Sequence, residues 1–180
     1  MNMSHSKSTP SHSQINFVNM NIDIDIYEDE VVYKFNGDVD ENFKQKDIPR
    51  IAKSNIIFEL ENVVNFNSCG IREWLYLIKD FSNLGQLIFK KCSMTMIDQI
   101  NMVPDCLGNG IVESFYAPYY CPHHGESLQL IDTNTHIDSL KSKIPPKFYC
   151  GICGTELEFD ALGESYFLFI EETEYIKSAS

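Results

Sequence analysis

Two short clusters of cysteine and histidine constrain the fold of this 180-residue chain more than any other feature of its sequence. They read CPHHG at residues 121–125 and CGICG at residues 150–154, and each offers two metal ligands separated by two residues. Such a turn points its amides at a thiolate sulfur while both side chains reach one ion, and thiolate and imidazole donors suit tetrahedral Zn²⁺. We therefore predict a zinc site formed by Cys121, His124, Cys150 and Cys153, with His123 as an alternative to His124.

The predicted zinc is structural, because four protein ligands leave no coordination position open for a catalytic water. We expect it to fold a zinc-ribbon-like subdomain over residues 118–172, where hydrophobic periodicity weakens and Cys, His, Gly and Pro become more frequent. The glycines beside the sulfurs are expected to relieve crowding. Six apolar residues are predicted to form the core of this subdomain or its contact with the main domain: Leu157, Phe159, Tyr166, Phe167, Leu168 and Phe169.

Two other interpretations of the clusters remain open. The cysteines can be unrelated reduced thiols, or Cys150 and Cys153 can form a redox pair. A redox pair normally lies at a helix N-terminus in a thioredoxin-like βαβ unit. The residues after Cys153, GTELEF, are typical of a strand, which favours the metal site.

The composition narrows the class of protein. Asp and Glu number 26 and Lys and Arg number 14, and the resulting net charge of −12 disfavours nucleic acid as a partner. No apolar run reaches the length of about 18 residues that a transmembrane helix needs, and the N-terminal residues MNMSHSKSTPSHSQ lack the apolar core of a secretory signal. We expect a cytoplasmic protein without a membrane partner, with buried, reduced Cys92 and Cys106 and with tails at residues 1–14 and 173–180.

Hydrophobic periodicity predicts an α/β domain over residues 15–117, with a mixed sheet flanked by helices. Apolar runs predict five strands, at residues 15–26, 31–35, 56–60, 86–90 and 111–116. Asn36-Gly37 predicts a turn after the second strand, and Glu59 is expected near the end of the third. One helix is predicted from residue 70 or 71 to about 84, and a second lies between an N-cap at Ser93 and Pro104.

The segment NSCG at residues 67–70 connects the third predicted strand to the first predicted helix. The first amides of a helix are unpaired, so the Ser68 hydroxyl can cap this helix. The same amides and the helix dipole would favour a phosphate on Ser68. The helix itself places Trp74 on an apolar face, as a core residue, and Arg72 and Glu73 on its solvent face.

Two stretches carry a resemblance to a known family. GDVD at residues 37–40 and IIFELENVVNFNSCGIREWL at residues 56–75 resemble the STAS domain of anti-sigma factor antagonists, over about residues 17 to 116. That family shows a Gly-Asp or Gly-Glu turn after its second strand and an Asp-Ser-Ser-Gly motif before an apolar helix. CSMTMIDQINMV, followed by a strand and CPHHG, looks like a bacterial subgroup with a C-terminal zinc ribbon. The resemblance implies a STAS-like mixed sheet with a small zinc-ribbon-like extension.

The resemblance also implies a function that is regulatory and not enzymatic. In that family the first Ser of the motif is phosphorylated by a serine kinase that doubles as an anti-sigma factor, and the unphosphorylated protein binds this kinase and frees the sigma factor. Ser68 takes the place of that Ser, while Asn67 and Cys69 replace the usual Asp and second Ser. The implied partner surface consists of Asn67, Ser68, Cys69, Gly70, Arg72 and Glu73.

Two alternative functions are retained. A zinc-ribbon nucleic-acid-binding protein is suggested by three lysines at residues 141–147 and opposed by the net charge of −12. A CxxC redox or zinc enzyme needs an open metal position or a low-pKa cysteine in a pocket. The histidines give no catalytic pattern, because His5 and His12 lie in the predicted tail, two lie in the first cluster and His136 lies in a predicted loop.

Overall fold

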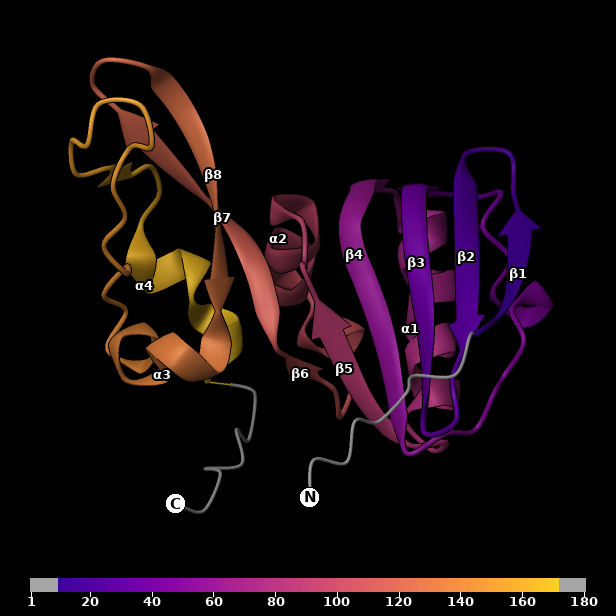
Figure 1. Ribbon diagram of the computed structural model, residues 1–180. Coiled ribbons are helices and arrows are strands. Elements are labelled where there is room, and N and C mark those ends of the chain that lie inside the picture. The colour runs from indigo at the N-terminus through magenta and orange to yellow at the C-terminus, as the bar shows by residue number, and fades with distance from the viewer. Residues whose placement is uncertain (1–9, 172–180) are drawn as a thin grey trace, which may run out of the picture.

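The computed structural model describes residues 10–171, so residues 1–9 of the predicted tail at residues 1–14, and the whole predicted tail at residues 173–180, lie outside the described part of the chain. A six-stranded sheet and a three-stranded sheet lie side by side, with helix α2 between them (Figure 1). The strands are β1 (Ser11–Asn16), β2 (Met20–Ile26), β3 (Glu30–Val39), β4 (Asn55–Phe66), β5 (Gln86–Lys90), β6 (Ile111–Val112), β7 (Ser114–Cys121), β8 (Gly125–Asp132) and β9 (Glu158–Phe159). The α-helices are α1 (Ser68–Phe81), α2 (Met94–Met102), α3 (Thr133–Lys141) and α4 (Gly163–Tyr166), and short 3-10 helices are η1 (Gln45–Asp47), η2 (Pro104–Cys106) and η3 (Leu168–Ile170).

The larger sheet is mixed, which confirms the predicted α/β class. Its order is β1-β2-β3-β4-β5-β6, with antiparallel pairing from β1 to β3 and parallel pairing from β3 to β6. Helix α1 covers one face of this sheet (Figure 1). Trp74 is fully buried there against the rings of Phe35 and Phe58, as the sequence predicted.

The strand predicted at residues 15–26 is two strands. β1 and β2 form an antiparallel hairpin closed by a bond from the Phe17 amide to the Met20 carbonyl at 2.7 Å. Residues 11–14, which were assigned to the N-terminal tail, therefore belong to edge strand β1. The alternation of apolar and polar residues changes phase at Phe17-Val18, and this break was the available signal of the reversal.

The turn predicted at Asn36-Gly37 is wrong, because β3 continues through both residues to Val39. The register of β3 against β4 shifts on either side of this point, which marks a bulge. Gly37 has a φ of 126°, and a Cβ on it would lie 2.1 Å from the Asn19 carbonyl oxygen. This glycine therefore permits close approach of the β1–β2 turn rather than reversal of the chain.

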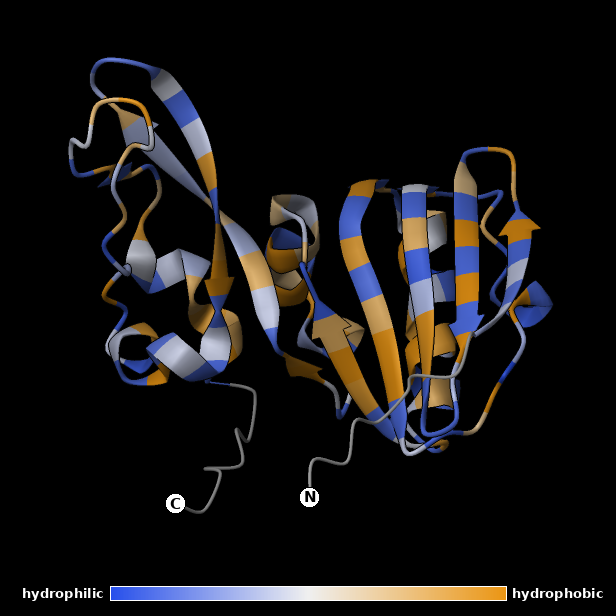
Figure 2. Ribbon diagram, viewed as in Figure 1, coloured by the Kyte–Doolittle hydropathy of each residue, from blue (hydrophilic) through white to orange (hydrophobic). Residues whose placement is uncertain are grey.

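Glu59 lies within β4 and not near its end, because β4 extends to Phe66. Its register partners are Lys34 on β3 and Lys90 on β5, so charges alternate across the face of the sheet opposite α1. In Figure 2, polar and apolar bands alternate along β2 to β5, as expected where successive residues point to opposite faces of the sheet. A charged residue inside an apolar run was thus a sign of an open sheet face.

The second helix agrees with its prediction. The Ser93 hydroxyl oxygen accepts a bond from the Met96 amide at 3.2 Å and donates to the Val63 carbonyl at 2.8 Å. Pro104 begins η2, after α2 has ended. The cap therefore also anchors α2 to the C-terminal end of β4.

The strand predicted at residues 111–116 is also two strands, and they belong to different sheets. β6 ends the larger sheet at Val112, and β7 starts the smaller sheet at Ser114. The domain boundary predicted at residue 117 therefore falls inside β7. Buried side chains from both sides of that position form one contiguous hydrophobic cluster.

The smaller sheet has the order β8-β7-β9 and is antiparallel throughout. Its predicted core is confirmed at Leu157, Tyr166, Phe167 and Phe169 and is wrong at Leu168, whose side chain is 42% exposed. Phe159 is partly buried against the core. Residues 124–150 hold β8 and α3, and His136 lies in this helix rather than in a loop.

Within residues 10–171, no helix combines the length and the apolar character needed to cross a membrane.

Candidate metal centre

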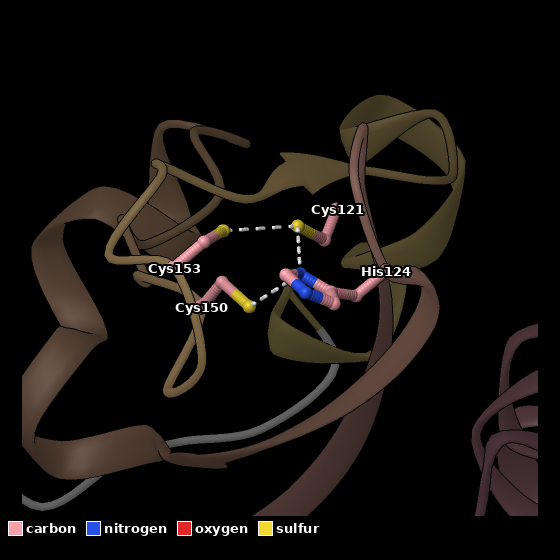
Figure 3. A group of neighbouring side chains, drawn as sticks. All are labelled: Cys121, His124, Cys150 and Cys153. Atoms are coloured by element: carbon pink, nitrogen blue, oxygen red, sulfur yellow. Dashed lines mark hydrogen bonds between the residues drawn. The ribbon is translucent and has the colours of Figure 1, made fainter.

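The structure brings all four predicted ligands together at one end of the smaller sheet (Figure 3). The Cys121 sulfur lies 3.5 Å from His124 Nδ1 and 3.7 Å from the Cys153 sulfur, and the Cys150 sulfur lies 3.5 Å from the same His124 nitrogen. All four ligand atoms lie within 4.8 Å of one another. Three sulfurs and one imidazole nitrogen therefore surround a single point, as a metal ion requires.

The first pair of ligands comes from the tip of the β7–β8 hairpin. Cys121 is the last residue of β7, and its register partner Gly125 is the first of β8. The His124 amide donates to the Cys121 carbonyl at 3.2 Å, which closes the turn. The amides of His123 and His124 also donate to the Cys121 sulfur. This is the amide-to-sulfur arrangement that the spacing predicted.

The second pair lies in a loop between residues 148 and 157. The Cys150 amide donates to the Thr155 carbonyl and the Gly154 amide to the Cys150 carbonyl, both at 2.8 Å. The Leu157 amide donates to the Phe148 carbonyl, also at 2.8 Å, and closes the base of the loop. Neither cysteine begins a helix, so the loop lacks the setting of a thioredoxin-like redox pair.

The glycines of the clusters do not relieve crowding, which corrects that prediction. A Cβ on Gly125, Gly151 or Gly154 would meet no atom within 4 Å. Gly125 has a φ of 85° and Gly154 a φ of 70°, which is the left-handed region that side chains disfavour. These two glycines are therefore needed for the backbone of the turns.

Thr155 is a residue that the sequence reasoning missed. Its hydroxyl oxygen lies 3.3 Å from the Cys153 sulfur. Hydrogen bonds to that sulfur from the hydroxyl and from the Thr155 backbone lower the pKa of Cys153 to about 6. The thiolate is then the main form at pH 7, and it is the form that binds metals. A hydroxyl residue two positions after a cysteine ligand was the available signal.

Burial differs sharply among the ligands. Cys121 is 1% exposed, Cys150 is half-buried, and His124 and Cys153 are exposed. Burial raises the pKa of the Cys121 thiol. The site therefore lies at the surface with one ligand anchored in the core, and metal binding would release the proton of that thiol.

The remaining candidates lie outside the cluster. His123 is exposed and its ring centroid is 6.5 Å from that of His124, so His124 is the histidine of the group. Cys92 and Cys106 are fully buried, as predicted, and burial raises the pKa of both thiols. Cys69 is exposed on α1.

The turn before α1 differs from its prediction in two respects, since the helix was expected to begin at residue 70 or 71 and Ser68 was expected to cap it. The helix begins at Ser68, and Asn67 is its cap, because the Asn67 Oδ1 accepts a bond from the Gly70 amide at 2.9 Å. Ser68 is therefore the exposed first residue of the helix and not its cap. Asn67 Nδ2 also donates to a carboxylate oxygen of Glu41 at 2.6 Å, so a carboxylate adjoins the turn although Asn67 itself has none.

The other residues of the predicted partner surface divide by burial. Cys69 and Arg72 are exposed, and Glu73 is partly buried and accepts a bond from the Gln45 amide at 3.3 Å. Gly70 is buried, and a Cβ on it would lie 1.8 Å from the Val39 carbonyl oxygen. Gly70 thus supports this surface from beneath and is not available to a partner.

A scan against models of known protein families gives no match, and a search of curated proteins gives none either.

Proposed function

We propose that this chain is a non-catalytic regulatory module of the STAS type that binds an anti-sigma factor or a related protein kinase in the bacterial cytoplasm. The observation that carries the proposal is the setting of Ser68. Its side chain is exposed at the first residue of α1, a helix of 14 residues whose N-terminus is held against β3. A partner can reach this hydroxyl, and the helix N-terminus would stabilise a phosphate on it.

The packing beneath the turn supports the STAS-like reading of the motifs. Gly37 and Gly70, the glycines of the two matching motifs, each face a backbone carbonyl at a distance that excludes a side chain. The Asn67 amide donates to the Val39 carbonyl at 3.2 Å, which ties the two motifs together. The motif residues are thus required by packing, and Ser68 is free for a partner.

A phosphate on Ser68 would change the charge of this surface in a definite way. It adds nearly two negative charges beside Glu41, whose carboxylate is bonded to Asn67. Arg72 lies four residues later on the same helix, within reach of the phosphate, and forms no ion pair with any other described residue. The phosphate would therefore repel the Glu41 carboxylate and attract the Arg72 guanidinium.

The test is affinity capture from native lysate with mass spectrometry, using wild type, Ser68→Asp and the control Ser54→Asp at another exposed serine. Wild type and the control should retain a kinase-like or anti-sigma regulator, and Ser68→Asp should lose at least tenfold of it. Equal capture by all three proteins would show that Ser68 does not control binding of the regulator. Capture of no such regulator by wild type would refute the proposed function.

For the metal centre we propose Zn²⁺ in a structural, zinc-ribbon-like role. In a tetrahedral zinc site with bonds of about 2.3 Å to sulfur and about 2.05 Å to nitrogen, two sulfurs lie about 3.8 Å apart and a sulfur and a nitrogen about 3.6 Å apart. The Cys121–Cys153 sulfurs are 3.7 Å apart, the Cys121 and Cys150 sulfurs each lie 3.5 Å from His124 Nδ1, and all four ligand atoms lie within 4.8 Å of one another. Their agreement and the three thiol ligands support zinc over metals that prefer oxygen.

Metal analysis of purified protein tests this assignment. Wild type should contain one equivalent of zinc, Cys153→Ser should lose it, and Cys69→Ser, which removes an exposed thiol outside the cluster, should keep it. A zinc-free wild type that also fails to bind added zinc would contradict the assignment.

A further inference from the structure

Edge strand β8 differs from the other edges of the two sheets. β1 is a polar edge with the sequence SHSQIN, and β6 and β9 have two residues each. β8 has eight residues, GESLQLID, without proline or lysine. Within residues 10–171, the backbone groups of its residues 125–131 have no backbone partner outside β7, and Asp132 at its end caps α3. Such an edge is a template for pairing with another strand, and proteins usually block it.

The outer face of the β7–β8 hairpin is apolar. Leu128 and Leu130 are 58% and 45% exposed, and their register partners on β7 are Pro118 and Tyr116. A hollow of about 560 Å³ lies beside Leu128 and is also lined by Met94 from α2. Exposed apolar area next to an open strand edge marks a binding surface more strongly than either feature alone.

The charges around this face select the partner. Glu126 and Asp132 share the face of β8 with the two leucines and flank them, and Asp160 lines the same hollow. None of these three carboxylates forms an ion pair with another described residue. Along β8, the side chains of this face are in turn acidic, apolar, apolar and acidic. A complementary strand would present basic, apolar, apolar and basic side chains in the same order.

A second copy of this chain does not meet that requirement. In an antiparallel pair of β8 strands, the register that places Leu128 opposite Leu130 also places Glu126 opposite Asp132. Like charges directly opposite each other destabilise a strand pair. The net charge of −12 on each copy opposes association further.

We propose that β8 binds an extended segment of a basic partner protein, which adds to the smaller sheet as a fourth strand. Main-chain bonds to the free edge hold the segment, two of its apolar side chains cover Leu128 and Leu130, and Lys or Arg residues pair with Glu126 and Asp132. This surface lies on β7–β8, and the Ser68 turn lies on α1, so the inference does not depend on the proposed function.

The probe is the peptide acetyl-Lys-Thr-Val-Thr-Val-Thr-Lys-amide, titrated into the full chain as purified. Hydrogen exchange should show protection of the β8 amides that are not bonded to β7, and affinity should fall with added salt. A peptide with Glu in place of both Lys is the charge control and should bind at least tenfold more weakly.

Substitutions of exposed residues locate the peptide-binding site and should not destabilise the protein. Leu128→Ser with Leu130→Ser should weaken peptide binding at least tenfold, and Glu126→Gln should weaken it severalfold. Leu162→Ser, at a leucine that is 77% exposed but outside the hairpin, should leave it unchanged.

Three results would overturn the proposal. The first is equal binding of the acidic peptide. The second is protection that is absent, or located outside β8, at saturating peptide. The third is a dimer of the free chain with protected β8 amides that the leucine variants return to monomer, because a second copy would then occupy the edge.

Discussion

Gly70 shows how a single residue without a side chain positions the start of α1. It packs under the first turn of the helix, where the Val39 carbonyl leaves no room for a Cβ. The N-cap Asn67 and the exposed Ser68 are fixed by the same contact. Gly70, the residue of the NSCG segment without a side chain, therefore determines the orientation of the other three residues.

Gly70→Ala should destabilise the protein, although alanine favours helices by about 1 kcal/mol over glycine. The added Cβ would lie 1.8 Å from the Val39 oxygen, so the helix or the strand must move, at a cost of about 1–3 kcal/mol or more. Urea unfolding measures the change. Gly151→Ala, where a Cβ meets nothing within 4 Å and φ is not positive, is the control and should be nearly neutral.

Residue types alone predicted the Cys/His cluster better than the helix cap. Only cysteine and histidine at this spacing combine soft donors with a tight turn, so the four clustered residues could be identified from the sequence. Asn and Ser are about equally good caps, and only the position of β3 decides that Asn67 and not Ser68 takes this role. Thr155 was missed because contact with Cys153 depends on the path of the loop.

At the scale of elements, regular segments were predictable and interrupted ones were not. β5 matches its predicted range, and α2 begins behind the predicted cap at Ser93. The failures lie where tertiary pairing overrides a local signal: β3 continues through Asn36-Gly37, and β4 continues past Glu59. In both cases the backbone N–H and C=O groups pair with a neighbouring strand, at a position where the local sequence predicts a turn or the end of a strand.

The pairing of β2 with β3 includes a charge contact that should make stability depend on pH. Lys34 Nζ lies 2.8 Å from the Asp25 carboxylate, and His12 Nδ1 lies at the same distance. The hydrogen bond from Lys34, followed by that from His12, lowers the pKa of Asp25 in the folded state. The carboxylate therefore stabilises the fold above its unfolded pKa of about 3.9, and this contribution is lost as the pH falls through the lower folded pKa.

Asp25→Asn tests this contact. The variant should be less stable than wild type by about 1 kcal/mol at pH 7, and the difference should shrink below pH 4 as the wild-type carboxyl takes up a proton. Urea unfolding at pH 7, 5 and 3 measures it. A difference that stays constant over this range would show that the Asp25 charge contributes nothing.

At the scale of the whole molecule, the domain boundary predicted from the sequence at residue 117 falls within strand β7, which is continuous. Composition changes near residue 118 because the first Cys/His cluster follows it, but β7 already starts at Ser114. Asn101 on α2 donates to the carbonyls of Ser165 and Tyr166 and accepts from the Phe169 amide, so the C-terminal residues dock onto the helix beside the larger sheet. Such long-range contacts leave no periodic signal in the sequence.

Removal of the proposed zinc should loosen the cluster but leave the larger sheet folded. Three of the four ligands are wholly or partly exposed at the end of the smaller sheet, whereas Trp74 is fully buried against the larger one. A chelator should therefore increase hydrogen exchange in residues 121–125 and 148–157 and lower the melting temperature. Trp74 fluorescence should remain that of a buried indole, and added zinc should reverse the changes. A shift of the emission to that of exposed tryptophan would contradict this expectation.

Glu113 is the one residue between β6 and β7. Its amide donates to the Phe89 carbonyl at 2.8 Å, its carbonyl accepts from the Thr133 amide at 2.9 Å, and its carboxylate pairs with Lys90 at 3.0 Å. Because the two sheets are connected by this single, fully bonded residue, the chain has no flexible linker between them. A fusion that replaces the chain on either side of Glu113 with a foreign partner would therefore remove bonds that join Glu113 to both Phe89 and Thr133.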